Sequence, residues 1–141
     1  MSMHGQLLIK KSDDQTLDVF IATIDKVIGP MRWEERQSSN YVDERYFFTS
    51  VLALQVTAAI ADDSEFSEYD FWLSIEPSVA DSCDKSFLDG LAAIIAKAFA
   101  LHGYEVLHPN DMSRPGNGGT VYRLNPDSLA KLRERVIVES L

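Results

Sequence analysis

The residues best suited to nucleophilic chemistry are Cys83, the only cysteine of the chain, and two of its histidines, His102 and His108. A catalytic thiolate needs a neighbouring base, so Cys83 with either histidine could in principle form a nucleophile and base pair. Asp81 and Asp84 lie close to the cysteine, and nearby anions raise the pKa of a thiol and disfavour its reactive form. The sequence therefore favours a small residue before a helix at this position.

Metal and phosphate chemistry have equally little support. His4, His102 and His108 show no H-x-x-x-H spacing, and the single cysteine allows no C-x-x-C pair. The acids at 62–65 lack the glycine and the distal glutamate of a calcium loop, so a charged turn is favoured. The glycines at 116–119 are followed by no lysine and lead into a predicted strand, so they form no phosphate cradle. We therefore expect a non-catalytic protein without a cofactor or metal.

Charge placement is the most informative feature of the sequence. The formal net charge is −9, and the segment from Asp62 to Asp89 holds nine acids and one base, Lys85, while the rest is nearly neutral. Such a field repels nucleic acid and attracts basic partners. A solubilising role is the alternative. We expect these acids to gather on one exposed surface that binds a basic protein, with the partner-binding residues Asp62, Asp63, Glu65, Glu68, Asp70, Trp72, Glu76 and Arg114.

Trp72 and Arg114 enter that set for different reasons. Alternation along 68–76 predicts Tyr69, Phe71, Leu73 and Ile75 on the buried face and Trp72 on the wet face, among Glu68 and Asp70. Aromatic residues carry much of the energy at contact centres, although core packing is favoured for Trp33 and Tyr41. The loop from Pro109 to Gly119 is long for a hairpin and reads either as a flexible tip or as a partner contact around Arg114.

Three helices are predicted to position these residues. The first runs from Gln15 to Ile28, with Ser12 and Gln15 as a capping box. The second, from Asp84 to His102, carries apolar residues over most of its circumference and is expected to be central. The third runs from Asn125 to Val138 with Leu129, Leu132, Val136 and Ile137 as its apolar stripe.

The remaining segments are predicted strands, and between Met31 and Glu76 the hydrophobic period changes from 3.6 to 2. They are Gln6 to Lys11, Trp33 to Gln37, Tyr41 to Thr49, Val51 to Ala61, Glu68 to Glu76, Tyr104 to His108 and Thr120 to Leu124. The segment Val51 to Ala61 could also be a buried helix, because it is rich in alanine. The order β-α-β-β-β-β-α-β-β-α predicts a single α+β domain over 1–141, a mostly antiparallel sheet with about three helices packed on one face.

The cellular setting also follows from absences. No apolar run approaches the ~20 residues that a membrane helix needs, and the first residues lack the pattern of a secretory signal. One cysteine allows no intrachain disulfide, so a reducing compartment is the natural setting. We expect a soluble, cytoplasmic protein that binds neither membrane nor nucleic acid.

The short, acidic, α+β chain without catalytic motif, with acids crowded around Tyr69-Asp70-Phe71-Trp72, resembles the small cytoplasmic immunity proteins of bacterial toxin systems, including contact-dependent growth inhibition. This resemblance covers the whole chain in kind and transfers no family residue. It implies a cognate inhibitor that binds a basic, nuclease-like toxin domain and occupies its cationic surface. We expect such a protein to be a monomer.

A second resemblance is to the type III secretion chaperones, whose order α-β-β-β-α-β-β-α is similar to the run from Gln15 to Val138. It implies a homodimer that holds an extended effector segment. The extra early strands and the long loop from Pro109 to Gly119 depart from that pattern. A small enzyme of unknown reaction is the third alternative.

Overall fold

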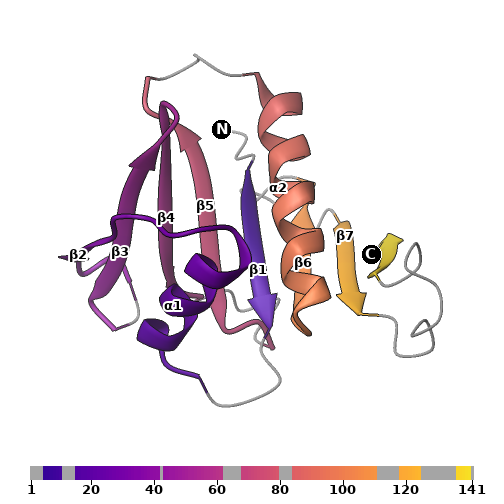
Figure 1. Cartoon of the computed structure of the whole chain (residues 1–141), viewed down its shortest axis with the longest axis horizontal. Coiled ribbons are helices and arrows are strands. Elements are labelled where there is room, and N and C mark those ends of the chain that lie inside the picture. The colour runs from indigo at the N-terminus through magenta and orange to yellow at the C-terminus, as the bar shows by residue number, and fades with distance from the viewer. Residues whose placement is uncertain are drawn as a thin grey trace.

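One antiparallel sheet organises the part of the chain that the computed structural model describes, which is residues 5–10, 15–41, 43–61, 68–79, 84–110, 118–124 and 136–140. Its eight strands lie in the order β2-β3-β4-β5-β1-β6-β7-β8, and two helices complete the described α+β fold (Figure 1). The elements are β1 (Gln6–Lys10), α1 (Leu17–Val27), β2 (Glu34–Gln37), β3 (Arg45–Val51), β4 (Leu54–Ile60), β5 (Phe71–Pro77), α2 (Lys85–Leu101), β6 (Glu105–Pro109), β7 (Gly119–Leu124) and β8 (Val136–Ser140).

The first strand is the centre of the sheet. β1 pairs with β5 on one side and with β6 on the other. Leu7, Leu8 and Ile9 are at most 1% exposed, because both faces of this strand are covered. A strand buried on both faces reads as a continuous apolar run, which explains why β1 shows little alternation. Gly5 precedes it with a φ of 75°, and an added Cβ there would collide with the carbonyl of Ile75.

Both helices pack on the same face of the sheet, where the main core lies (Figure 1). Phe20 of α1 stacks on Phe71 of β5, with ring centroids 4.3 Å apart, and lies 5.8 Å from the ring of Phe99 in α2. Phe99 in turn meets Tyr104 edge to face at 5.6 Å. These four rings join both helices to the sheet, and Phe20 and Phe99 are fully buried.

The helix boundaries agree with the prediction more closely for α2 than for α1. Asp84 caps α2 by accepting a hydrogen bond from the Phe87 amide at 2.9 Å. In α1 the N-cap is Thr16, whose hydroxyl accepts from the Val19 amide at 3.2 Å, so the predicted capping box placed the start too early. Ser12 itself lies outside the described residues.

The prediction of about three helices is wrong for the described residues, which form two. Val136–Ser140, partly assigned to the third helix, is strand β8 and pairs with β7, Val138 opposite Tyr122. Three consecutive β-branched residues begin β8, and such residues favour a strand where an unpaired sheet edge is within reach. Residues 125–135 lie outside the described part of the chain.

The ambiguous segment Val51 to Ala61 is a strand, not a helix. β4 alternates buried Leu54, Val56 and Ala58 with less buried residues. A two-residue loop, Leu52 and Ala53, joins it to β3, and both residues have positive φ, 51° and 61°. Positive φ at both central positions matches a type I′ hairpin turn.

That turn yields a stability prediction. Replacing Leu52 and Ala53 with Asn and Gly should stabilise the fold by about 1–2 kcal/mol, because left-handed backbone costs other L-residues roughly that much. Leu52 is 89% exposed, so the change removes no core contact. Urea unfolding measures the effect, and Val79→Asn, at another exposed apolar position, is the matched control. An unchanged or lower midpoint for the Asn-Gly variant would contradict the turn assignment.

Candidate functional site

The face of the sheet opposite the helices, called here the helix-free face, carries the candidate site. Phe71, Leu73 and Ile75 of β5 join the core beneath the helices, so the alternate residues of β5 point to the other side. The pairing of Trp72 with Leu8 and with Ala59 extends this face across β1 and β4. No helix of the described residues packs on it (Figure 1).

Three aromatic side chains gather on the helix-free face and form what we call the aromatic cluster: Tyr41, Tyr46 and Trp72. The Tyr41 ring lies 4.8 Å from that of Tyr46 and 6.0 Å from that of Trp72, and all three residues are partly buried. Burial raises the pKa of Tyr41, and the nearby Tyr46 and Glu76 raise it further. A carboxylate therefore lies beside the rings, and the tyrosine stays neutral at physiological pH.

The β2–β3 loop holds Tyr41 in this position. The Tyr41 amide donates to the Ser38 carbonyl at 3.3 Å, and the Glu44 amide donates to the Tyr41 carbonyl at 3.0 Å. The Ser38 amide closes the loop on the Glu44 carbonyl at 2.9 Å. Glu44 has a φ of 60°, which allows the chain to turn into β3. Backbone hydrogen bonds, and not strand geometry, thus bring Tyr41 over the sheet.

A cation extends the cluster toward the edge strand. The Arg36 guanidinium of β2 lies 4.1 Å from the centroid of the Phe48 ring and bonds the Glu34 carboxylate at 3.0 Å. Hydrogen bonds to Glu34 and then to Tyr46 raise the pKa of Arg36. The outer part of the helix-free face thus combines an aromatic ring, a stacked guanidinium and a carboxylate.

A second, smaller apolar cluster adjoins Trp72. Leu8, Tyr69 and Leu107 are buried there, with Trp72 packed against them. The prediction that Tyr69 shares a face with Phe71 is therefore wrong, because Tyr69 precedes β5 and does not follow its alternation. The Tyr69 hydroxyl donates to Glu105 at 3.2 Å, and burial, followed by the charge of Glu105, raises the pKa of the phenol. Trp72 connects this cluster with the aromatic one.

A buried polar pair leads from the middle of the sheet to the surface. Gln6 is 2% exposed, and its Nε2 donates to Ser74 Oγ at 2.5 Å. Ser74 Oγ donates to the exposed carboxylate of Glu76 at 3.4 Å. The side-chain amide oxygen of Gln6, Oε1, has no hydrogen-bond partner among the described residues. This chain helps to orient Glu76 beside the aromatic cluster.

The described acids do not gather on one surface, contrary to the prediction. Glu68 and Asp70 lie before β5, and Glu76 lies near its other end, about 20 Å along the strand. Asp84 caps α2 and Asp89 belongs to it, on the opposite face, where Asp89 contacts the His108 ring at 3.2 Å. The four other acids of the window and the predicted contact Arg114 lie outside the described residues: Asp62, Asp63, Glu65 and Asp81.

Trp72 is the one predicted site residue that the structure places at the centre of a built surface. Core packing is the expectation from the sequence for Tyr41, and the sequence predicts no role for Tyr46 or Phe48. The signal was present, because alternation over 45–51 puts Tyr46 and Phe48 on the same side of β3, opposite Phe47.

The residues considered for catalysis are not brought together in the described structure. His102 ends α2 and is exposed, while His108 contacts Asp89 from β6. Cys83 lies outside the described residues. Within the described ranges no three potential metal ligands form a group, and no helix is both long and apolar enough to cross a membrane.

Comparison of the chain with protein-family models, curated proteins and solved structures finds no match. A functional assignment therefore depends on the surfaces themselves. Among the described residues, the helix-free face carries a group of partly buried rings with Trp72 at its centre.

The buried tyrosines predict alkaline lability. Burial raises the pKa of Tyr41, Tyr69 and Tyr122 in the folded chain above the ordinary value of 10. The folded state thus keeps protons that the unfolded state releases, so the free energy of unfolding should fall as pH rises above about 10. Urea unfolding at several pH values measures the slope. Tyr69→Phe should make the fall of the free energy of unfolding with pH shallower. An unchanged slope would contradict the raised pKa of Tyr69 in the folded chain.

Proposed function

We propose that the chain is a non-catalytic immunity protein that binds and neutralises a cognate, basic, nuclease-like toxin domain. The contact surface in this proposal is the helix-free face around Trp72. The observation that carries it is the aromatic cluster, three partly buried rings on a sheet face that no described helix covers. Rings held in this way offer contact area at little further cost in side-chain entropy.

The composition of this face supports a protein partner. Contact centres are enriched in tryptophan, tyrosine and arginine, and a polar rim surrounds them. Here Trp72 and Tyr41 are central, Arg36 is stacked on Phe48, and the exposed Glu76 stands at the rim. Such a surface can exclude water around its rings while charged groups at the rim set the orientation.

Charge supports a basic partner. The net charge of −9 favours approach of a cationic protein over tens of ångströms at low salt, which raises the association rate more than the affinity. A nuclease domain must present a cationic groove to its substrate. An acidic protein that covers this groove would exclude the substrate, so inhibition needs no catalytic residue on this chain.

The aromatic cluster can be tested by truncation. Trp72→Ala should weaken binding to the cognate toxin domain by about 30-fold or more, the effect of losing a contact-centre residue. Calorimetry gives the affinity, and protection of cells that express the toxin gives the function. Trp33→Ala is the matched control, because Trp33 packs against the core of the helix side. Equal effects of the two changes, with the fold retained, would refute this surface.

The acids before β5 can be tested by charge reversal. Reversing Glu68 and Asp70 to lysine should slow association at low salt, with the fold retained, because Glu68 is exposed and Asp70 only partly buried. Two further double variants change the net charge by the same amount. Glu68→Gln with Asp70→Asn removes two negative charges at the proposed contact, and Val19→Lys with Ala22→Lys adds two positive charges on α1. Stopped-flow association rates that fall equally in both pairs would show that only net charge matters.

A further inference from the structure

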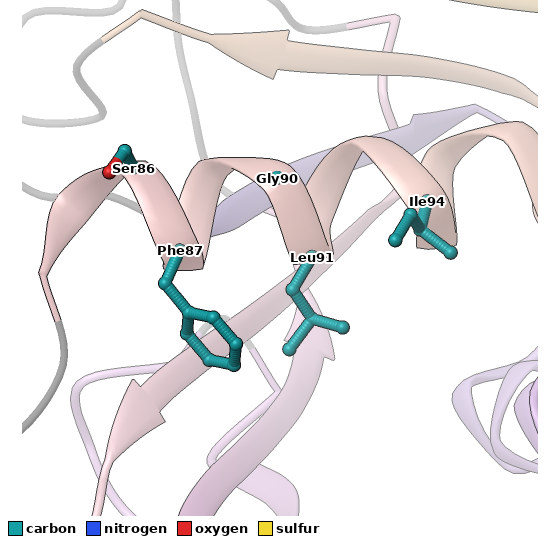
Figure 2. A pocket seen from close by; sticks show the side chains of 5 residues that line it. All are labelled: Ser86, Phe87, Gly90, Leu91 and Ile94. Atoms are coloured by element: carbon teal, nitrogen blue, oxygen red, sulfur yellow. The ribbon is translucent and has the colours of Figure 1, made fainter.

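The exposed apolar surfaces of the described chain differ in the charges beside them. On the outward face of α2, Phe87 is 54% and Ile94 67% exposed, and Figure 2 shows both projecting from the helix beside Leu91. The prediction that α2 is central is therefore wrong for this side of the helix. None of the described residues that line the shallow hollow there is charged, so its chemistry indicates no particular partner. The aromatic cluster differs, because the carboxylate of Glu76 stands beside its rings.

The described chain already holds two guanidinium groups by one arrangement, with a ring on one side and carboxylates on the other. The Arg36 guanidinium lies 4.1 Å from the centroid of the Phe48 ring and bonds Glu34 at 3.0 Å. The Arg45 guanidinium lies 5.7 Å from the centroid of the Phe47 ring and bonds three carboxylates. In this arrangement the ring face attracts the cation, and the carboxylate accepts charge-assisted hydrogen bonds from it.

The aromatic cluster and Glu76 repeat two parts of this arrangement. The Tyr41 ring lies 6.0 Å from that of Trp72, and Trp72 and Glu76 point to the same side of β5, because an even number of positions separates them. Burial raises the pKa of Tyr41, and the charge of Glu76 adds to this rise, so the carboxylate lies near the Tyr41 ring.

The third part, a cation, does not come from the described residues. Glu76 is exposed, and its carboxylate accepts a hydrogen bond from Ser74 Oγ at 3.4 Å. No lysine or arginine of the described ranges forms an ion pair with it. Glu34 and Glu139, on the same face of the sheet, are by contrast bonded to Arg36 and Arg123. Glu76 is thus an oriented carboxylate beside partly buried rings, with its charge still open to a partner.

We propose that Tyr41, Trp72 and Glu76 form a seat for a guanidinium group, which an arginine side chain of the bound partner supplies. The guanidinium stacks on the Tyr41 ring and donates hydrogen bonds to the Glu76 carboxylate. Arginine fits this seat better than lysine, because its planar group stacks on a ring, presents paired donors to a carboxylate and is less strongly hydrated than an ammonium.

The seat deepens the proposed function and rests on it for the identity of the partner. Arginines of a nuclease groove bind the phosphates of the substrate through paired hydrogen bonds, and a carboxylate accepts the same pair. An arginine of the toxin domain that is held by Glu76 is no longer available to a phosphate. The seat would therefore compete directly with nucleic acid for a group that the toxin needs.

A titration with short cationic peptides tests the seat without a toxin. The probes are tri-arginine and tri-lysine with blocked ends, and the readout is the NMR signal of each tryptophan indole N–H in the full chain. Tri-arginine should shift the Trp72 signal and bind at least about 3-fold more tightly than tri-lysine, with the Trp33 signal unmoved. Equal affinities of the two peptides, or an unmoved Trp72 signal, would overturn the seat.

Single substitutions test its two parts. Glu76→Gln should weaken tri-arginine binding by about 5-fold, because a neutral amide no longer attracts the guanidinium. Tyr41→Leu should remove the preference for tri-arginine over tri-lysine, because it removes the ring. Glu68→Gln is the matched control, since it removes the same charge from an exposed residue before β5. Equal weakening by Glu68→Gln and Glu76→Gln would show that only net charge acts and would overturn the seat.

The cognate toxin domain separates failure of the seat from failure of the proposed function. Toxin binding that withstands Trp72→Ala would refute the proposed toxin surface, while a peptide preference that depends on Glu76 would still support the seat. Toxin binding that is lost on Trp72→Ala but unchanged by Glu76→Gln would support the surface and overturn the seat. Weakening of about 5-fold or more by Glu76→Gln, with Glu68→Gln weaker in effect, would support both.

Discussion

Two helices cannot cover both faces of an eight-stranded sheet, and the described structure is organised around this constraint. Seven interstrand gaps make the sheet roughly 34 Å wide, whereas each helix covers about 10 Å of it. Both helices are used on one face, where Phe20, Phe71 and Phe99 join them to the sheet. The other face must satisfy its own side chains without a helix.

The helix-free face does this with rings and short polar contacts. Trp72 is shielded by Tyr41 from the β2–β3 loop, and Tyr69 is held by its hydrogen bond to Glu105. Gln6 and Ser74 bond each other in the middle of the sheet. These contacts leave the rings only partly buried, which makes the surface both stable alone and able to lose more water in a complex.

The helix side is not fully closed either. Arg45 of β3 bonds Asp18, Glu35 and Asp43, which fastens α1 to the edge of the sheet, and hydrogen bonds to these carboxylates raise the pKa of the guanidinium. α2 lies farther along the sheet with an uncovered outward face. The packing of the described elements therefore leaves two surfaces uncovered: the helix-free face of the sheet and the outward face of α2.

Local pattern determined much of the fold. The apolar spacing of α1 and α2, the alternation of β5 and the run of β1 depend on neighbours in sequence, and the sequence predicted all four segments. Long-range packing decided the rest. Val136–Ser140 is a strand because β7 offers an edge, Tyr69 turns away from Phe71 because it precedes β5, and the acids divide between two layers because α2 crosses to the opposite face. Which apolar side of α2 is buried likewise depends on the sheet, because the apolar residues lie over most of the circumference of the helix and only tertiary packing decides which of them lose water.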